Sequence, residues 1–240
     1  MKIGIISQAR MTSTRLPGKV LKKIDNISLL KYHVERLKWS KMPIYIATTT
    51  NGTDDLIIKF CEEEALNYYR GEENNVLSRY YGCAKENNLD VIVRVTSDCP
   101  LIDGALIKKT WELEQSNFKT FDYISNVIER TFPRGFDFEI FSFEYLELAY
   151  KNTNLLSDLE HVTPYIHQNK LGKTVYKSSL HQENKSHYRV TVDTVEDFKV
   201  IKELIEQFAA QEKSYSEIIK ILDQNPTIVA INQAIEQKKL

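Results

Sequence analysis

The amino-acid sequence predicts an α/β protein with a mostly parallel central sheet, helices on both faces of that sheet, and a small α+β insertion. Short apolar runs alternate with amphipathic stretches along the first half of the chain, which is typical of parallel strands joined by crossover helices. The runs at residues 2–7 and 90–95 are rich in β-branched residues, as expected of buried strands. Polar loops follow both runs, at residues 8–19 and 96–103, where ligands bind in such sheets.

The individual elements of the first half follow from hydrophobic spacing. Leu30, Val34 and Leu37 recur at helical spacing and predict a helix after the first polar loop. The expected strands are residues 2–7, 43–48, 66–70 and 90–95, and the further expected helices are residues 54–65, 76–86 and 105–113.

The second half is less regular and contains a turn signal, Pro-Arg-Gly, at residues 133–135. Strands are expected at residues 123–127, 136–141, 174–178 and 188–192, and helices at 142–151, 160–169, 198–208 and from 215 onward. No linker rich in Pro, Gly or Ser and no internal repeat divides the chain. The simplest organisation is one domain, residues 1–240, with an inserted α+β portion.

Composition and charge exclude several classes of protein. Hydrophobic residues make up 42% of the chain and charged residues 27%, a balance typical of globular proteins. A formal net charge of −1 provides no field that would draw the protein to nucleic acid or to a membrane surface. The three cysteines form no CxxC pair, and no apolar run approaches the ~20 residues that a membrane span needs. A protein of the reducing cytoplasm, without membrane insertion, is expected.

The loop at residues 8–19 has the composition of a phosphate-binding site. Arg10, Arg15 and Lys19 supply three cations among small polar residues, and Gly18 allows a close turn of the backbone. Backbone amides and hydroxyls can cradle the oxygens of a triphosphate while the cations neutralise its charge. The loop does not match a Walker motif. A solvated basic loop is the alternative, but the position after a buried strand favours phosphate binding.

Two aspartates, Asp98 and Asp193, follow expected strands at the binding edge of the sheet. Mg²⁺ prefers carboxylate, phosphate and water oxygens and often takes only one or two protein carboxylates, so these residues can share one ion. The alternative is that each aspartate caps the helix that follows it. Asp197 is expected to be a surface or capping residue, and Cys99 a small buried hydrophobe.

Residues 130–139, RTFPRGFDFE, combine cations, carboxylates and a rigid turn. Alternation along the expected strand would put Asp137 and Glu139 on one face, where they could hydrogen-bond the hydroxyl groups of a ligand. An ordinary half-exposed strand is the alternative. Arg94, on the strand before Asp98, is unfavourable to bury unpaired and should face the site or an internal carboxylate.

Five ordered motifs resemble those of the cytidylyltransferases that activate acidic sugars. They are QARMTSTRLPGKVL at 8–21, DCPLID at 98–103, RTFP at 130–133, EHVTPY at 160–165 and VDTVED at 192–197. The chain is most similar to the spore-coat polysaccharide biosynthesis branch, whose members are relatives of acylneuraminate and 3-deoxy-manno-octulosonate cytidylyltransferases. The resemblance covers about residues 1–200 and implies a Rossmann-like sheet of the nucleotide-diphospho-sugar transferase type. Residues 201–240 carry no motif of this family.

Carried over by position, the resemblance implies a role for each matching residue. Lys19 would stabilise charge on the α-phosphate and on the departing pyrophosphate, and it would act with Arg10, Asp98 and Asp193 as the catalytic set. The two aspartates match the residues that bind Mg²⁺. The residues expected at the nucleotide are Gln8, Ala9, Arg10, Ser13, Thr14, Arg15, Lys19, Arg94 and Thr96. Those expected at the acceptor are Asp137, Glu139, His161 and Arg189.

Two of these residues have an alternative that involves no acceptor. His161 has a structural histidine as its alternative, and Arg189 a surface arginine. Arg134 departs from the usual residue of this branch and receives no role.

The resulting hypothesis is a Mg²⁺-dependent transfer of CMP from CTP to a hydroxyl of an acidic sugar, with release of pyrophosphate. CTP and a nonulosonic or similar ulosonic acid are the expected partners, and a homodimer is expected with an acceptor-binding and dimerisation portion at about residues 123–180. One alternative is a metal-dependent glycosyltransferase, which a DxD motif would favour, but none occurs. The other is a nucleotide-binding regulatory module, which would have the loop without the metal-binding carboxylates.

Overall fold

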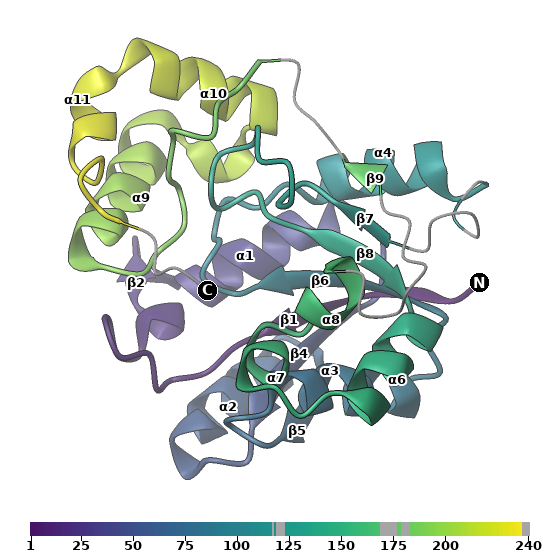
Figure 1. The fold of residues 1–240 in the computed structure, drawn as a ribbon. Helices are drawn as coiled ribbons and strands as arrows, with labels where there is room; N and C mark the ends of the chain where they lie inside the picture. Colours follow the sequence, from purple (N-terminus) through teal and green to yellow (C-terminus); the bar gives the residue numbers. More distant parts are fainter. Residues whose placement is uncertain (117, 119–122, 169–176, 179–182, 237–240) are drawn as a thin grey trace.

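The computed structural model describes residues 1–116, 118, 123–168, 177–178 and 183–236 (Figure 1). Within these ranges a seven-stranded sheet has the order β5-β4-β1-β6-β8-β7-β9. The parallel strands are β5 (Asn67–Gly71), β4 (Ile44–Thr49), β1 (Ile3–Gln8) and β6 (Val91–Thr96). β8 (Glu139–Ser142) is antiparallel to β6 and to β7 (Tyr123–Ser125), and β9 (Lys177–Ser178) is parallel to β7. The predicted α/β class with a mostly parallel sheet is confirmed.

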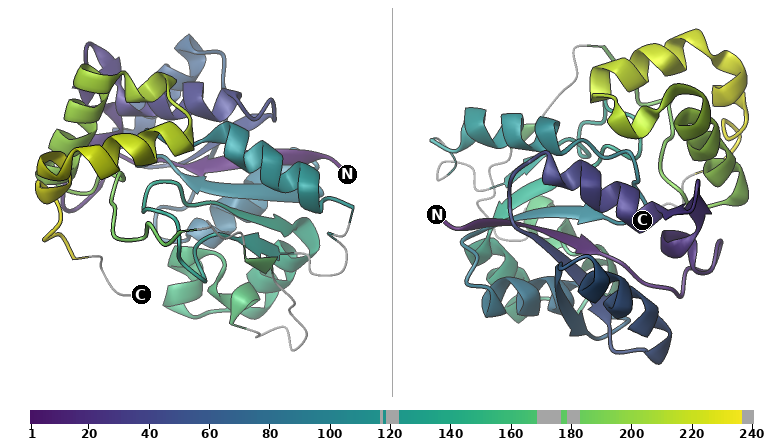
Figure 2. Two further views of the ribbon diagram at one scale, coloured as in Figure 1. Left: turned by 90° about the horizontal axis from the view of Figure 1, so that it is seen from above. Right: turned by 180° about the vertical axis from the view of Figure 1, so that it is seen from behind.

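Alternate residues of the central strands face opposite sides of the sheet, so Ile5 and Ile6 of β1 belong to two different apolar clusters. Helices α1 (Leu29–Lys38) and α4 (Gly104–Glu114) cover the first face, and α2 (Asp55–Glu63) contributes to the same cluster. Helices α3 (Val76–Glu86) and α6 (Phe143–Asn152) cover the second face. The two layers can be followed in Figure 2. Burial on both sides explains why these strands are continuous apolar runs.

A third apolar cluster contains the C-terminal helices α9 (Val195–Phe208) and α10 (Tyr215–Gln224) (Figure 1). It also contains Leu16 from the loop at 8–19 and Leu29 from α1, so the two ends of the chain share one core. The short elements are η1 (Lys19–Leu21), β2 (Lys23–Ile24), β3 (Ile27–Ser28), η2 (Gly52–Asp54), α7 (Leu156–His161), α8 (Pro164–His167), η3 (Ala210–Glu212) and α11 (Pro226–Ala230). Across the described ranges, no helix has both the length and the apolar character that a membrane crossing requires.

Several predicted elements of the second half are wrong. The helix predicted at 160–169 is divided into α7 and α8, because the backbone reverses at Val162, which has φ 72°. The strand predicted at 188–192 makes one isolated bridge, between Arg134 and Arg189. The strands predicted at 123–127 and 136–141 are shorter than expected, as β7 and β8 show. Residue 169 of the predicted helix and residues 174–176 of the predicted strand lie outside the described residues.

Candidate active site

A cavity of about 690 Å³ lies at the carboxyl ends of β1 and β6. Each residue that the sequence predicts at the nucleotide lines this cavity, from Gln8 in the loop to Thr96 at the end of β6. Asp98 and Asp193 line it as well, although they are far apart in the sequence. The predicted convergence of the cationic loop and the two carboxylates is confirmed.

Buried Asp54, at the end of η2, holds the loop at 8–19 against β4. One of its carboxylate oxygens accepts from the Met11 backbone N–H at 2.7 Å, and the other accepts from the hydroxyls of Thr48 and Thr49. Gly18 has φ 66°, and its backbone N–H donates to the Met11 carbonyl at 2.9 Å. The loop is therefore closed on itself and attached to the sheet, which leaves its cations directed at the cavity.

Lys19 lies between the two aspartates. Its ammonium donates to Asp98 Oδ2, to Asp193 Oδ1 and to the Val192 carbonyl, each at 2.8 Å. Burial acts to lower the pKa of Lys19, but Asp98 and Asp193 outweigh it and raise that pKa above its ordinary value. Burial likewise acts to raise the pKa of Asp98, yet the Lys19 ammonium holds this pKa well below its usual range. Lys19 and Asp98 are therefore both ionised near neutral pH.

The segment that carries Asp98 rests on buried polar groups. His33 of α1 joins the Ser7 hydroxyl, 2.8 Å from its Nε2, to the Cys99 carbonyl, 2.8 Å from its Nδ1. The Asp98 carbonyl accepts from the Val192 backbone N–H at 2.8 Å, which fixes the segment of Asp193 beside it. Cys99 is buried, and burial raises its pKa well above the usual range, so the prediction of a small buried residue is confirmed.

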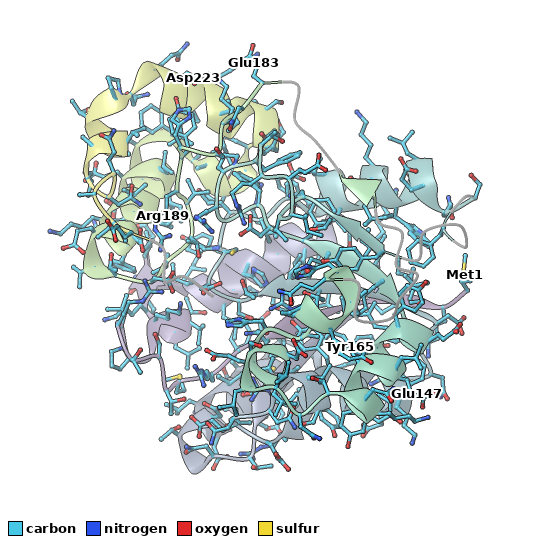
Figure 3. The ribbon with its side chains drawn as sticks, in the orientation of Figure 1. Met1, Glu147, Tyr165, Glu183, Arg189 and Asp223 are labelled. Carbon is cyan, nitrogen blue, oxygen red and sulfur yellow. The ribbon has the colours of Figure 1, made fainter. Side chains whose placement is uncertain are left out.

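Arg189 does not line the cavity and is engaged within the protein, so the structure gives its predicted acceptor role no support. It lies in the segment that leads into α9 (Figure 3) and is 8% exposed. Its Nε donates to Asp197 Oδ1 and its Nη2 to Asp193 Oδ2, both at 2.8 Å. Asp197 is 0% exposed and forms a capping box with Thr194. Its predicted capping role is confirmed and its predicted surface position is wrong, because Arg189 compensates its buried charge.

A second cavity, of about 640 Å³, adjoins the first, and the two share Arg94, Thr96, Arg134, Asp137 and His161. Its wall includes β8 and the segment before α8. The shared residues make this cavity the candidate for a second substrate.

Glu139 lines the second cavity, but its carboxylate is engaged within the protein. It bonds Arg94, accepts from the Tyr123 hydroxyl at 2.5 Å, and accepts from the Thr163 hydroxyl at 2.6 Å. The expected internal partner of Arg94 is thus Glu139, and the acceptor role of Glu139 stays a prediction. Asp137 lines both cavities and is paired with Arg130 at 2.7 Å. The two carboxylates do not share one face of a strand. Glu139 is the first residue of β8, whereas Asp137 precedes the strand.

His161 ends α7 and lines both cavities. The next residue, Val162, has φ 72° and ψ −53°, and the Thr163 backbone N–H donates to the His161 carbonyl at 2.8 Å. This is a γ-turn in its rare, strained form. The turn directs His161 to the cavities and Thr163 to buried Glu139, so strain is stored where function is expected.

Arg134 is a cavity residue to which the sequence assigned no role. Within the described ranges its guanidinium makes no hydrogen bond or ion pair, yet it lines both cavities. Burial and the neighbouring Arg130 lower its pKa. A half-buried cation beside another cation is unfavourable unless an anion arrives. Arg10 is a second cavity cation without a hydrogen bond or ion pair in the part of the chain described.

Glu73, which precedes α3, is a further cavity residue that the sequence did not predict. It accepts from the Thr12 hydroxyl and from Asn51 Nδ2, the latter at 2.9 Å, and it lines the first cavity. Its position before a predicted helix suggested only a loop residue. Asp54 likewise carried only the signal of a helix start, and neither position indicated a partner in the distant loop at 8–19.

The donor set of Asp98 and Asp193 fits Mg²⁺. No group of three or more His, Cys, Asp or Glu side chains in the described ranges forms a ready-made metal cage. The two carboxylates are nevertheless close enough to share one cation, because both contact the Lys19 ammonium at 2.8 Å. Two carboxylates beside a phosphate-binding loop are the type of site that Mg²⁺ uses together with phosphate oxygens.

Comparisons with known proteins identify the family of this chain. A family model described as "Cytidylyltransferase" matches residues 3–235. The uncharacterised protein MJ1063 of Methanocaldococcus jannaschii is 40% identical over 241 residues, which cover 99% of this chain and 97% of that protein. The spore coat polysaccharide biosynthesis protein SpsF of Bacillus subtilis is 31% identical over 251 residues, which cover 97% of this chain and 98% of that protein.

Solved structures show the same relationship. A cytidylyltransferase from Leptospira borgpetersenii is 35% identical and superposes with a TM-score of 0.91 over 100% of both chains. CMP:2-keto-3-deoxy-manno-octonic acid synthetase in complex with CTP has a TM-score of 0.62 at 13% identity, with 86% of this chain and 99% of that one covered, and shows the fold alone. The regulatory module and the glycosyltransferase considered above find no support in these matches. The chain belongs to the cytidylyltransferase family and is a nucleotidyltransferase.

Proposed function

We propose that this enzyme transfers CMP from CTP to a hydroxyl of an acidic sugar, with Mg²⁺, in the synthesis of a surface polysaccharide or glycan. The observation that carries the proposal is the meeting of Lys19, Asp98 and Asp193 at the phosphate-binding loop. Nucleotidyl transfer depends mainly on position and charge, and this site supplies both. The name of SpsF supports the choice of pathway.

The loop at 8–19 binds the triphosphate. Arg10, without an ionic partner in the described ranges, and Arg15 neutralise phosphate oxygens, and Lys19 turns its ammonium from the aspartates to the α-phosphate. The acceptor hydroxyl attacks the α-phosphorus in line; a phosphorus–oxygen bond forms to the sugar, the hydroxyl proton passes to water, and the bond to pyrophosphate breaks. Asp98 and Asp193 would hold Mg²⁺, which would neutralise charge on the phosphates and orient them.

The second cavity receives the acceptor. Asp137 and His161 lie where they can hydrogen-bond sugar hydroxyls, since both line the boundary with the nucleotide cavity. Arg134, a cation in need of an anion, supports an acceptor that carries a carboxylate. The proposal extends to a homodimer in the cytoplasm, with residues of about 123–180 near the interface; its support is the resemblance of the sequence motifs.

Release of pyrophosphate from CTP tests the proposal. Purified enzyme is incubated with Mg²⁺, CTP and a panel of neuraminic, legionaminic, pseudaminic and octulosonic acids, with each acid's methyl ester as a neutral counterpart. We expect pyrophosphate and a CMP-sugar with at least one acid and with none of the esters. UTP, ATP and GTP in place of CTP should give far less product.

Asp98→Asn should lower the turnover with CTP at least 10³-fold, because it removes a carboxylate from the centre of the site. The matched control is Asp25→Asn, in the exposed turn between β2 and β3, where φ 50° suits asparagine. Retained turnover in Asp98→Asn would refute the metal assignment. Absence of pyrophosphate with every acid, or equal use of the esters, would refute the acceptor class.

A further inference from the structure

Three of the four carboxylate oxygens of Asp98 and Asp193 contact cations of the protein. Oδ1 of Asp193 contacts Lys19 at 2.8 Å, and Oδ2 contacts Arg15 at 2.9 Å and Arg189 at 2.8 Å. Oδ2 of Asp98 contacts the same Lys19 ammonium at 2.8 Å. Both oxygens of Asp193 therefore contact cations of the protein. On Asp98, the remaining oxygen accepts from the Cys99 thiol, at 3.5 Å.

The charges of this cluster cancel. Asp98, Asp193 and Asp197 carry three negative charges, and Lys19, Arg15 and Arg189 carry three positive ones, all linked by contacts of 2.8–2.9 Å. A divalent cation that approached the free enzyme would meet a neutral cluster and would have to displace the Lys19 ammonium before it could bind both carboxylates. The free energy needed to remove water from the divalent cation would not be offset by attraction to a neutral cluster.

The cations differ in how firmly they are held. Arg189 is fixed by two bonds to buried Asp197, at 2.8 and 3.0 Å, and cannot leave. Lys19 and Arg15 both belong to the loop at 8–19, and the side chain of Arg15 is 38% exposed. A triphosphate in the first cavity offers these two side chains an anion of higher charge than the aspartates.

We propose that Lys19 and Arg15 close the Asp98–Asp193 pair to divalent cations in the free enzyme, and that nucleotide opens it by drawing both side chains onto its phosphates. The inference rests on the proposed function of this site. It predicts an order of binding, in which the metal ion enters with the nucleotide or after it. It also gives Lys19 a second role. The residue that assists transfer keeps divalent cations from the two aspartates before the nucleotide binds.

Binding of Mn²⁺, a paramagnetic substitute for Mg²⁺, to nucleotide-free enzyme tests this role by electron paramagnetic resonance of the free ion. We expect Lys19→Met to bind Mn²⁺ at least tenfold more tightly than wild type, and Arg15→Met severalfold more tightly. The double variant Lys19→Met with Asp98→Asn should lose the gain. The control Lys22→Met, one turn along and exposed, should match wild type. A non-hydrolysable methylene analogue of CTP should confer Mn²⁺ binding on the wild type.

Two results would overturn the inference. One is wild-type enzyme that binds Mn²⁺ without nucleotide as tightly as Lys19→Met does. The other is no gain in either the Lys19 or the Arg15 variant; because Arg15 is exposed, its variant stays informative if Lys19→Met is poorly folded. The measurement involves no turnover, so failure of the proposed acceptor chemistry would appear only in the pyrophosphate assay and is distinguishable.

Discussion

A single buried histidine, His33, supports the segment that carries Asp98. The Cys99 carbonyl can only accept a hydrogen bond, so Nδ1 of His33 carries the proton and Nε2 accepts from the Ser7 hydroxyl. Burial lowers the pKa of His33 from 6.5 to about 4. The folded protein therefore holds this ring neutral, whereas the unfolded chain binds a proton below pH of about 6.5. Stability is complete above that pH and declines as the pH falls towards 4.

The first prediction concerns this loss of stability at acid pH. Between pH of about 7 and 4, His33 should lower the free energy of unfolding by up to about 3 kcal/mol, from 1.36 kcal/mol per pKa unit. His33→Gln, which cannot be protonated, should be less stable at neutral pH but should show a shallower decline. The measurement is chemical unfolding at several pH values, with the exposed His187→Gln as control. Parallel declines in wild type and His33→Gln would contradict the assignment.

At the scale of single residues, the sequence reveals chemistry but not partners. Asp98 and Asp193 could be matched from their motifs, and they do meet at Lys19. Arg189 and Glu139 have the residue types expected of an acceptor site, yet each is engaged by a charge of the protein itself, Arg189 by Asp197 and Glu139 by Arg94. Nothing local to a charged residue says whether its counter-ion will be a ligand or the protein itself.

At the scale of elements, the turn at residues 133–135 fixes the position of the segment that leads to Asp193. The Arg134 backbone N–H donates to the Tyr188 carbonyl at 3.1 Å, and the Arg134 carbonyl accepts from the Val190 backbone N–H at 2.8 Å. Between Arg134 and Phe136, Gly135 has φ 107° and lies against Val190. The absence of a side chain at Gly135 lets the turn lie directly on the segment that leads to Asp193.

Gly135→Ala should be strongly destabilising. An added Cβ would meet the Val190 carbonyl carbon at 2.6 Å, and φ 107° is a conformation that only glycine adopts readily. We expect a loss of about 2–5 kcal/mol in unfolding free energy, from strain and overpacking together. Gly52→Ala is the control, because a Cβ there meets nothing within 4 Å. Thermal unfolding of the two variants measures this loss. A Gly135→Ala protein as stable as Gly52→Ala would refute the argument.

The same turn explains why residues 188–192 are not a strand. Residues 188–192 are all buried, as expected of a strand in the core. The backbone partners, however, change along the segment: Arg134 bonds its first part, and the Asp98 carbonyl accepts from the Val192 N–H. The sequence can indicate that a segment is buried, and it does not show whether one neighbour supplies a continuous ladder.

The break between α7 and α8 had a signal that the prediction did not use. Pro164 disfavours the helical conformation at the residue before it, and a helix was nevertheless predicted through it. The reversal itself falls at Val162, a β-branched residue for which positive φ is unusual. Only its tertiary surroundings, in which Val162 is fully buried, hold it there.

At the scale of the whole molecule, the C-terminal helices complete the site although residues 201–240 carry no motif. Helices α9 and α10 share one apolar cluster with Leu16 of the nucleotide loop. Beyond α11, buried Asn232 donates from Nδ2 to Asp197 Oδ1 at 2.8 Å and to the Arg189 carbonyl at 3.1 Å. The sequence could predict helices here from their amphipathic spacing, but not that an asparagine near the C-terminus supports the carboxylates of the active site.

Asn232 should therefore influence both stability and turnover. Asn232→Ala leaves Asp197 with one fewer donor, and we expect a loss of about 1–3 kcal/mol in unfolding free energy. Asn232→Asp should be worse near neutral pH, because it sets a second buried carboxylate against Asp197. Its pKa would be raised in the folded state, so the gap between the two variants should narrow as the pH falls. Asn152→Ala, exposed at the end of α6, is the control. If the aspartate variant is as stable as the alanine variant at neutral pH, Asn232 does not contact the Arg189–Asp197 pair in solution.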